Sequence, residues 1–558
     1  MTISSLQQAR AAYQPKLPVS LQGSVKVCVG AATQSVADQA KIKELFPNTY
    51  GLPLITFEAA GASQAAFPAI NVGVILSGGQ APGGHNVISG LFDGLKKLNP
   101  ASRLYGFLGG PSGLVDNKYV EITAEFLNPY RNTGGFDIIG SGRTKLEKEA
   151  QFDTGLANLK KLGITALVII GGDDSNTNAA LLAEYYAAKN AGVQVIGCPK
   201  TIDGDLKNEM IETSFGFDTA VKVYSELIGN IERDANSAKK YWHFIKLMGR
   251  SASHIALEAA LQTQPNITLI SEEVFAKAET LDEIVNYIAD IVIERSKNGN
   301  NFGVALIPEG LLEFIPEIKK LISALNTLLA VDKDHPDSNP VVNELKATND
   351  NDQKVEIVTR HLTIIEPELS AKFTSLPAAQ RIQLILERDE HGNLPVSQIE
   401  TEKLLGDLVK AKVKSKDRDV KFSVQYHFFG YEGRCAAPSN FDADYCYSLG
   451  YTASVLIANG STGYMASVRN TTAPADKWIA GGIPITMMMN MEIRQGEEKP
   501  VIQKALVDLN GKPFAYFKEH RDTWAKETSY VYPGPIQYFG PTETCDRTTI
   551  TLELEKGK

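Results

Sequence analysis

The run Ala166-Leu167-Val168-Ile169-Ile170 is followed at once by the loop Gly171-Gly172-Asp173-Asp174-Ser175. Five consecutive apolar residues predict a strand that is buried on both faces, as in a parallel sheet. The glycines allow a backbone to approach a phosphate closely, and the carboxylates of Asp173 and Asp174 can hold a metal ion or take a proton. Taken alone, the loop is explained equally well as a glycine turn with Asp174 or Ser175 as the N-cap of a helix.

A second strand pattern, over 193–197, precedes the loop Pro199-Lys200-Thr201-Ile202-Asp203-Gly204-Asp205. In this loop Asp203 is a candidate general base, and Thr201 is a candidate donor to a phosphate. Lys200 could offset charge on a transferred group. The alternative is a surface turn whose two carboxylates are merely solvated.

Strands alternate with helices along much of the chain. A strand is expected over 72–76, a glycine loop over 77–84 and a helix over 85–98, and the same order recurs around Gly171, with a helix over 177–190. Such alternation predicts parallel sheets covered on both faces, with ligands at the carboxyl ends of the strands. The predicted fold class is therefore α/β, with two doubly wound, mostly parallel-sheet domains.

The expected organisation has five parts. They are an N-terminal extension (1–69), an α/β domain (70–214 plus about 440–485), a second α/β domain (215–310 plus 421–439), a helical insertion (311–420) and a C-terminal segment that packs on the body (486–558). Apolar residues at a 3.6-residue period within 318–329 predict the insertion, and Ser397 with Glu400 could form a capping box there. Ile550, Leu552 and Leu554 alternate with polar residues, which predicts a half-buried strand.

Composition narrows the class of protein. The chain has 558 residues, 43% of them hydrophobic, and a net charge of −9. An acidic chain disfavours nucleic acid as a partner, so an anionic substrate would need a local cluster of Lys and Arg. We expect no membrane span, because no run of residues is long and apolar enough to cross a bilayer. The five cysteines are widely spaced, which favours a reduced, cytoplasmic protein.

Several short motifs place cations beside glycines. Arg143 lies in the glycine-containing run 140–145, a composition that suits an anion site. Arg250 and Arg434 each follow a glycine, and either guanidinium could form two hydrogen bonds to a phosphate. Glu309 ends an expected strand and could accept hydrogen bonds from a sugar. Each motif alone is explained at least as well by a solvated turn or an exposed side chain.

Taken jointly and in this order, the motifs resemble the phosphofructokinase family, over roughly residues 70–310 and 422–480. Asp174 and Lys200 stand where ATP-dependent members typically carry glycine, and the pair is similar to that of the long, pyrophosphate-dependent members. A carboxylate at 174 would occupy the space of a nucleotide α-phosphate and repel it, whereas Lys200 would stabilise pyrophosphate.

The resemblance implies a Mg²⁺-dependent, reversible enzyme of glycolysis and gluconeogenesis. It would transfer phosphate from pyrophosphate to fructose 6-phosphate, giving fructose 1,6-bisphosphate and phosphate. The alternatives are an ATP-dependent phosphofructokinase, a nucleotide- or lipid-type kinase that shares the Gly-Gly-Asp loop, and a non-catalytic subunit that senses sugar phosphate.

The resemblance also implies a role for each matched position. Asp203 would activate the sugar hydroxyl, Asp173 would bind Mg²⁺, and the catalytic set would be Asp203, Lys200, Asp174 and Arg250. Pyrophosphate would be bound by Gly78, Gly79, Arg143, Gly172, Asp174, Ser175 and Lys200. The sugar phosphate would be bound by Thr201, Ile202, Asp203, Asp205, Lys240, Tyr241, Met248, Gly249, Arg250, Glu309, Tyr431 and Arg434. Lys240 and Tyr241 would reach a neighbouring subunit's site, which implies a homodimer or a higher homo-oligomer. Tyr431 departs from the histidine of many ATP-dependent members.

Overall fold

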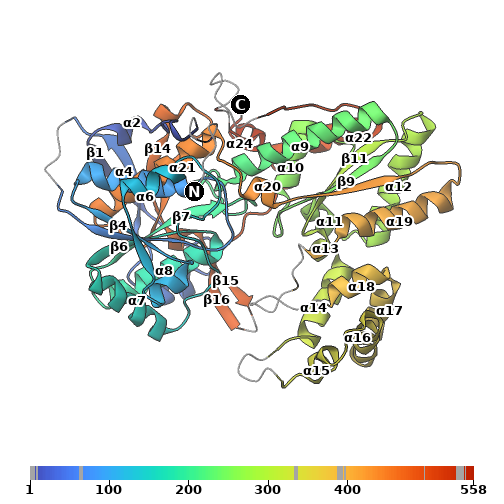
Figure 1. Ribbon diagram of the computed structural model, residues 1–558, viewed down its shortest axis with the longest axis horizontal. Helices are drawn as coiled ribbons and strands as arrows, with labels where there is room; N and C mark the ends of the chain where they lie inside the picture. The colour runs from blue at the N-terminus through green and yellow to red at the C-terminus, as the bar shows by residue number, and fades with distance from the viewer. Residues whose placement is uncertain are drawn as a thin grey trace. The chain divides into compact units, whose positions relative to one another are not determined.

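The computed structural model describes residues 10–61, 67–331, 337–385, 398–494, 497–535 and 548–557, together with Gln7, Leu394 and Asp546 (Figure 1). The chain forms two compact units. Unit 1 consists of Met1–Tyr224, Tyr431–Ala505 and Pro535–Lys558, and unit 2 consists of Ser225–Gly430 and Leu506–Gly534. Each unit is therefore assembled from segments that are distant in the sequence. The finer division into five parts stays a prediction.

Unit 1 is built on one large sheet. Within the described residues its strand order is β1-β2-β14-β13-β7-β6-β3-β4-β5, and β8 pairs with β7 beside this path. The strands are β1 (Val25–Ala32), β2 (Pro53–Ala59), β3 (Asn71–Leu76), β4 (Arg103–Phe107), β5 (Tyr119–Ile122), β6 (Ile164–Gly171), β7 (Gln194–Thr201), β8 (Phe215–Gly216), β13 (Tyr464–Arg469) and β14 (Ile479–Pro484). The run from β13 to β4 is parallel, and both edges are antiparallel. The three strands predicted at 72–76, 166–170 and 193–197 lie side by side in this run as β3, β6 and β7.

Helices cover both faces of this sheet (Figure 1). On one face lie α4 (Gly84–Leu98) and α21 (Asn440–Ala458), and on the other lie α7 (Glu149–Lys161) and α8 (Asp173–Ala188). The side chains of Ile75, Leu167 and Val195 pack with those of α7 and α8 in one buried core. The remaining short helices of unit 1 are α2 (Val19–Gln22), α3 (Gln39–Leu45), α5 (Pro111–Val115), α6 (Ala124–Leu127), η1 (Asn128–Tyr130), α20 (Tyr431–Arg434), η3 (Ala475–Lys477), η4 (Ile485–Met488) and α24 (Ile550–Glu555).

The two ends of unit 1 differ from the sequence expectation in their local structure. β1 and β2 extend the sheet because β2 pairs with β14, although no strand was predicted in this part of the chain. The strand predicted around Ile550 is wrong, because these residues form α24. Thr549 is its N-cap and accepts a hydrogen bond from the backbone N–H of Leu552, so capping outweighs the alternating pattern.

Unit 2 contains a smaller, wholly parallel sheet. Its order is β10-β11-β9-β12, formed by β9 (Trp242–Leu247), β10 (Ile267–Thr268), β11 (Gly303–Pro308) and β12 (Val424–Phe429). Trp242 and Phe244 are fully buried in a core with α12 (Leu281–Lys297) and α19 (Thr401–Lys416). Other helices of unit 2 are α10 (His254–Thr263), α11 (Ser271–Ala276), α13 (Leu311–Phe314) and α22 (Lys512–Lys526). The helix α9 (Phe217–Ala238) belongs to unit 1 up to Tyr224 and to unit 2 from Ser225. The predicted α/β class with mostly parallel sheets is confirmed.

The segment 311–420 is helical where it is described. Between α13 and α19 it contains α14 (Pro316–Leu328), α15 (Pro340–Lys346), α16 (Asn351–Ile365), α17 (Pro367–Ser375) and α18 (Ala378–Leu384). Ile318, Leu321 and Leu325 are buried, as their 3.6-residue period predicts. Ser397 of the expected capping box lies outside the described residues. Over the part of the chain that the structure describes, no helix combines the length and hydropathy needed to cross a bilayer.

Candidate active site

The loops that follow β3, β6 and β7 meet at the carboxyl ends of these strands in unit 1. The hydroxyl of Ser175, after β6, donates to the hydroxyl of Ser77, after β3, at 2.8 Å. The buried amide of Asn176 donates to the carbonyl oxygens of Gly171 at 2.6 Å, Gly172 at 2.9 Å and Cys198 at 3.3 Å. Asn176 therefore ties the ends of β6 and β7 together. Sequence reasoning missed this residue, because the helix was predicted over 177–190 and Asn176 precedes that range, whereas α8 begins at Asp173.

The first turn of α8 carries the two acidic residues of the β6 loop. The helix begins at Asp173 with Gly172 as N-cap, and no side chain caps it. Neither Asp174 nor Ser175 therefore serves as the N-cap, and the helix starts four residues earlier than its apolar pattern predicted. Carboxylates in a first turn interact favourably with the helix dipole.

Lys200 is a buried cation near the end of β7, which continues to Thr201 and so includes the first residues of the loop predicted at 199–205. Lys200 is 7% exposed, and its ammonium lies beside the glycine backbones of the neighbouring loops. A Cβ atom added to Gly78 would lie 3.5 Å from Nζ, and one added to Gly172 would lie 3.7 Å from it. Gly78 also has a φ of +81°, which favours glycine. Burial, with the charge of Arg434, lowers the pKa of Lys200 to about 8, against the attraction of the nearby aspartates.

Arg434 reaches the same place from α20. Its Nε donates to the carbonyl oxygen of Gln80 at 3.1 Å, and its guanidinium lies against Gly79, where a Cβ atom would collide with it. The Tyr431 ring, whose residue is 64% exposed, lies 5.8 Å from this guanidinium. Arg143 is exposed and follows Gly142, whose carbonyl accepts a 2.9 Å hydrogen bond from the N–H of Gly78. The structure thus gathers cations from three distant segments around the β3 loop.

Two carboxylates, Asp203 and Asp205, follow β7. Asp205 is buried, and burial together with the charges of Asp203 and Asp173 raises its pKa to about 7, against the attraction of Lys504. The backbone N–H of Asp203 donates to the hydroxyl of Thr201 at 3.0 Å. Between the two aspartates, Gly204 has a φ of +75°, a conformation that keeps both acids in one tight turn.

Further cations come from the C-terminal segment and were missed by sequence reasoning. Nζ of Lys504 lies 3.5 Å from Oδ2 of Asp173 and 3.9 Å from Oδ2 of Asp205. Nη1 of Arg494, in the hairpin of β15 (Met489–Arg494) and β16 (Glu497–Ile502), lies 2.8 Å from Oδ1 of Asp174. Burial alone would raise the pKa of Asp174, but its neighbouring cations, Lys145 at 3.6 Å among them, lower it. No local motif around 494 or 504 marks either residue, because only the fold brings them to the loops.

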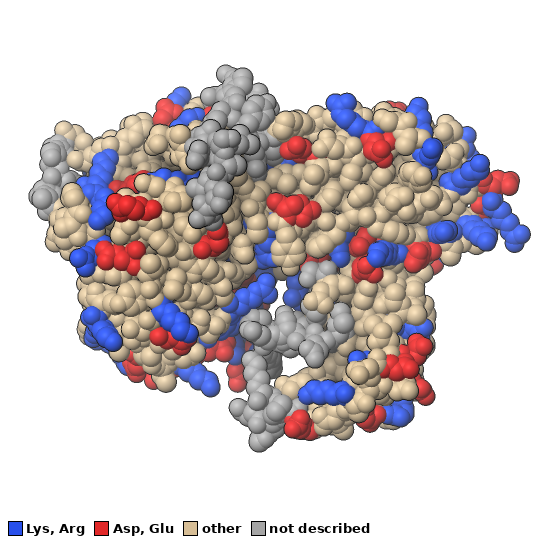
Figure 2. All heavy atoms as spheres, viewed as in Figure 1, with Lys and Arg blue, Asp and Glu red and all other residues tan. Residues whose placement is uncertain are grey.

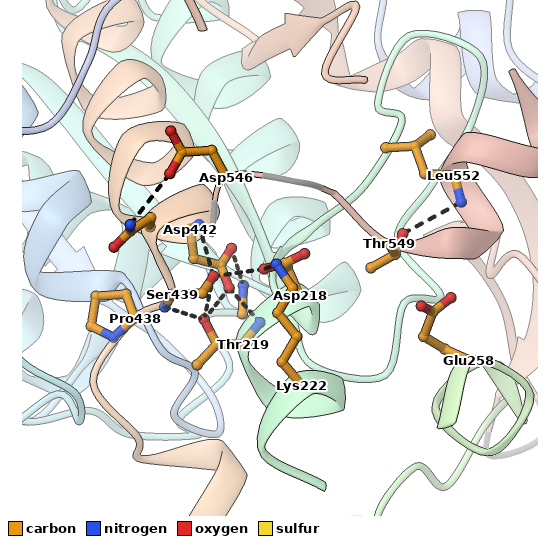
Figure 3. Close-up of polar contacts among 12 residues, drawn as sticks. Asp218, Thr219, Lys222, Glu258, Pro438, Ser439, Asp442, Asp546, Thr549 and Leu552 are labelled. Atoms are coloured by element: carbon orange, nitrogen blue, oxygen red, sulfur yellow. Dashed lines mark hydrogen bonds and ion pairs between the residues drawn. The ribbon is translucent and has the colours of Figure 1, made fainter. Parts of the chain in front are cut away.

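A buried polar network lies beneath the β7 loop (Figure 3). Asp442 of α21 accepts hydrogen bonds from the N–H groups of Gly216 at 3.1 Å and Thr219 at 2.9 Å. Gly216 is the β8 partner of Thr201. The network continues through Ser439, which donates to Asp218 at 2.6 Å, and Lys222, which lies 2.7 Å from the same carboxylate. These contacts fix β8 and, through it, the end of β7.

A second group of predicted residues lies in unit 2. Met248, Gly249 and Arg250 directly follow β9, and Glu309 directly follows β11. The guanidinium of Arg250 contacts both carboxylate oxygens of Glu313 on α13, at 3.1 and 3.3 Å. Lys240 and Tyr241 directly precede β9, and Lys240 is exposed. Because strands β9 and β11 are parallel neighbours, Arg250 and Glu309 leave the same edge of this sheet.

The predicted residues therefore fall into two groups. Unit 1 holds Gly78, Gly79, Arg143, Gly172, Asp173, Asp174, Ser175, Lys200, Thr201, Ile202, Asp203, Asp205, Tyr431 and Arg434. Unit 2 holds Lys240, Tyr241, Met248, Gly249, Arg250 and Glu309. Figure 2 shows basic and acidic side chains interspersed over the visible face. Local groups of Lys and Arg that could bind an anion are therefore compatible with the net charge of −9.

The acidic group of unit 1 fits a magnesium ion. The charges of Asp203 and Asp173 help to raise the pKa of Asp205, and a divalent cation beside these carboxylates would relieve that repulsion. Among the described residues, no set of three or more His, Cys, Asp and Glu side chains is arranged to hold a metal. Mg²⁺ does not require such a set, because it commonly takes one or two protein carboxylates and completes its shell with water and substrate phosphates.

Known proteins resemble this chain in sequence and in fold. The phosphofructokinase family model matches residues 71–457. A Porphyromonas gingivalis protein named pyrophosphate–fructose 6-phosphate 1-phosphotransferase is 60% identical, and one of the same name from Entamoeba histolytica is 54% identical; each alignment covers 100% of both chains. The solved pyrophosphate-dependent phosphofructokinase of Nitrosospira multiformis has a TM-score of 0.54 at 14% identity, covering 87% of this chain and 98% of that one. This last likeness concerns the fold alone.

Proposed function

The chain belongs to the phosphofructokinase family, and from that premise we propose that it transfers a phosphoryl group reversibly from pyrophosphate to the 1-hydroxyl of fructose 6-phosphate. The products are fructose 1,6-bisphosphate and phosphate. The relatives with more than half of their residues identical carry the name of this activity. The proposal includes a homo-oligomer of at least two chains in the cytoplasm, as the family resemblance predicts.

The proximity of two cations, Lys200 and Arg434, is the observation that carries the proposal. Lys200 of β7 and Arg434 of α20 lie beside the β3 loop, and the charge of Arg434 helps to depress the pKa of Lys200. Like charges held together by the fold repel each other until an anion lies between or beside them. Because Gly78 and Gly79 carry no side chains, both cations approach the backbone of the β3 loop, where an anion would contact the two together. A small, highly charged donor such as pyrophosphate fits this arrangement.

Asp203 is the proposed base. As the sugar oxygen attacks phosphorus, its proton passes to the Asp203 carboxylate, and the bond to the leaving phosphate breaks in line. The hydroxyl of Thr201 accepts the N–H of Asp203, so its own proton can be donated to a phosphate oxygen. Lys200 offsets charge that develops on the transferred group.

Asp173 is the proposed magnesium ligand, and the bound ion would neutralise charge on the pyrophosphate oxygens. Arg250 and Glu309 are proposed to bind the sugar phosphate, with Met248, Gly249, Tyr431 and Arg434. Arg250 is already oriented by Glu313, which limits the rotamer entropy lost when it binds an anion. Lys240 and Tyr241 are proposed to serve a neighbouring subunit.

A donor comparison on the purified protein tests the proposal. With Mg²⁺ and fructose 6-phosphate, we expect rapid formation of fructose 1,6-bisphosphate from pyrophosphate and little from ATP. The reverse reaction should release pyrophosphate when phosphate is supplied. A clear preference for ATP would reject the proposed donor, and no turnover with either donor would favour a non-catalytic, sugar-phosphate-sensing subunit.

A further inference from the structure

Lys504 is held in place by its backbone neighbours on both sides. It follows β16, outside the region 71–457 that the family model matches. The N–H of Ile502 donates to the hydroxyl of Thr177 on α8 at 3.2 Å. The N–H of Ala505 donates to the carbonyl oxygen of Asp205 at 2.7 Å. The position of Lys504 is therefore fixed to α8 and to the loop after β7, the two segments that carry the acidic residues.

The ammonium of Lys504 connects carboxylates from different loops. It lies 3.5 Å from Asp173 after β6 and 3.9 Å from Asp205 after β7. The side chain is about one-third exposed, whereas that of Asp205 is 9% exposed. A cation thus lies among the acidic residues in the protein itself, and it contacts the carboxylate proposed above as the magnesium ligand.

We propose that Lys504 is a built-in counter-ion that competes with the divalent metal for Asp173. The inference rests on the proposed function, since it takes Asp173 as the metal ligand. In the free enzyme the ammonium balances the acidic residues and keeps their structure without a metal. Metal binding must displace the ammonium from Asp173 or share this oxygen with it. The metal is therefore bound weakly until the phosphates of the donor supply further ligands.

The direction of the effect follows from Coulomb's law. An ammonium near a carboxylate repels an incoming divalent ion and occupies one of its ligand atoms. Because the pair is partly exposed, the effect is moderate. Replacing Lys504 by methionine keeps most of the volume and removes the charge. We expect Lys504→Met to bind a divalent metal about three- to tenfold more tightly than the unmodified protein.

The test is a titration of the full-length protein with Mn²⁺, without pyrophosphate or sugar phosphate, in which free Mn²⁺ is measured by electron paramagnetic resonance. Lys504→Met should lower the dissociation constant, and Lys504→Arg, which keeps the charge, should stay near the unmodified protein. Lys145→Met is the matched control. It removes an ammonium that lies 3.6 Å from Asp174 instead of Asp173, and it should change Mn²⁺ binding less than Lys504→Met does. Circular dichroism verifies the fold of each variant.

The variant Asp173→Asn distinguishes two assumptions, that Asp173 is the metal ligand and that Lys504 competes with the metal for it. If this variant loses Mn²⁺ binding while Lys504→Met binds Mn²⁺ no more tightly, Asp173 remains the ligand and the competition is refuted. Unchanged Mn²⁺ binding with a raised KM for pyrophosphate in Lys504→Met would likewise overturn the inference, because Lys504 would then be a donor-binding residue. If Asp173→Asn binds Mn²⁺ normally, the metal assignment itself fails.

Discussion

The depressed pKa of Lys200 predicts how pyrophosphate binding depends on pH. Burial lowers this pKa from its usual value to about 8. The Lys200 side chain is therefore mostly protonated and charged below pH 8, and mostly neutral above it. With that pKa, about 90% of Lys200 is protonated at pH 7 and about 10% at pH 9. If binding requires the charged form, the association constant should fall about tenfold between these two values.

The neighbour of Lys200 supplies the sharpest variant. The charge of Arg434 is the second cause of the depressed pKa, so Arg434→Gln should move the midpoint of the pH dependence upward without altering Lys200. Isothermal titration calorimetry with pyrophosphate and Mg²⁺, without fructose 6-phosphate, measures binding alone. The ionisation of pyrophosphate contributes equally in both proteins and cancels in the comparison. An identical midpoint in the two proteins would refute the proposed coupling, and a flat profile above pH 8 would remove Lys200 from donor binding.

Three more variants test the acidic residues of the loops and of α21. Asp203→Ser should reduce turnover by about 10²–10⁴-fold or more with an unchanged circular dichroism spectrum, because a positioned base is lost; near-normal turnover would exclude it as the base. Asp174→Gly should weaken pyrophosphate use and admit ATP, measured as the ratio of kcat/KM for the two donors, and an unchanged ratio would contradict the donor argument. Burial raises the pKa of Asp442 to about 7, so the unfolded chain ionises first and stability falls as the pH rises from about 4 towards 7. Asp442→Asn should remove that loss of stability, so the melting temperature of the variant should change less across this pH range than that of the unmodified protein. An equal pH dependence in the two proteins would show that Asp442 is ionised throughout the range.

The strands and glycine loops of the two sheets could be predicted from the sequence because their signals are local. β6 and β7 each contain an apolar run at the centre of the strand, and carboxylates follow both strands: Asp173 after β6 and Asp203 after β7. Parallel strands place such ends at one edge, so the meeting of Gly172, Asp203 and Lys200 follows from pattern alone.

The rest of the site depends on contacts between distant segments. Lys504 is about 300 residues from Asp205 in sequence, and no spacing rule connects them. A strand was predicted where α24 forms, because six residues are too few to distinguish a hydrophobic period of 2.0 residues from one of 3.6. The N-cap residue Thr549 favours the helix. Long-range pairing and capping, rather than composition, fix these parts of the structure.

The position of Asp174 changes the explanation of donor choice. Its carboxylate lies 2.8 Å from Arg494 and 3.6 Å from Lys145, so its charge is offset by two cations. A paired carboxylate repels a nucleotide phosphate less than an unpaired one does, whereas the volume of the side chain is unaffected. Exclusion of ATP should therefore depend mainly on volume. Asp174→Asn, which keeps the volume and removes the charge, should continue to reject ATP while Asp174→Gly accepts it. Equal ATP use by the two variants would instead assign donor choice to the charge.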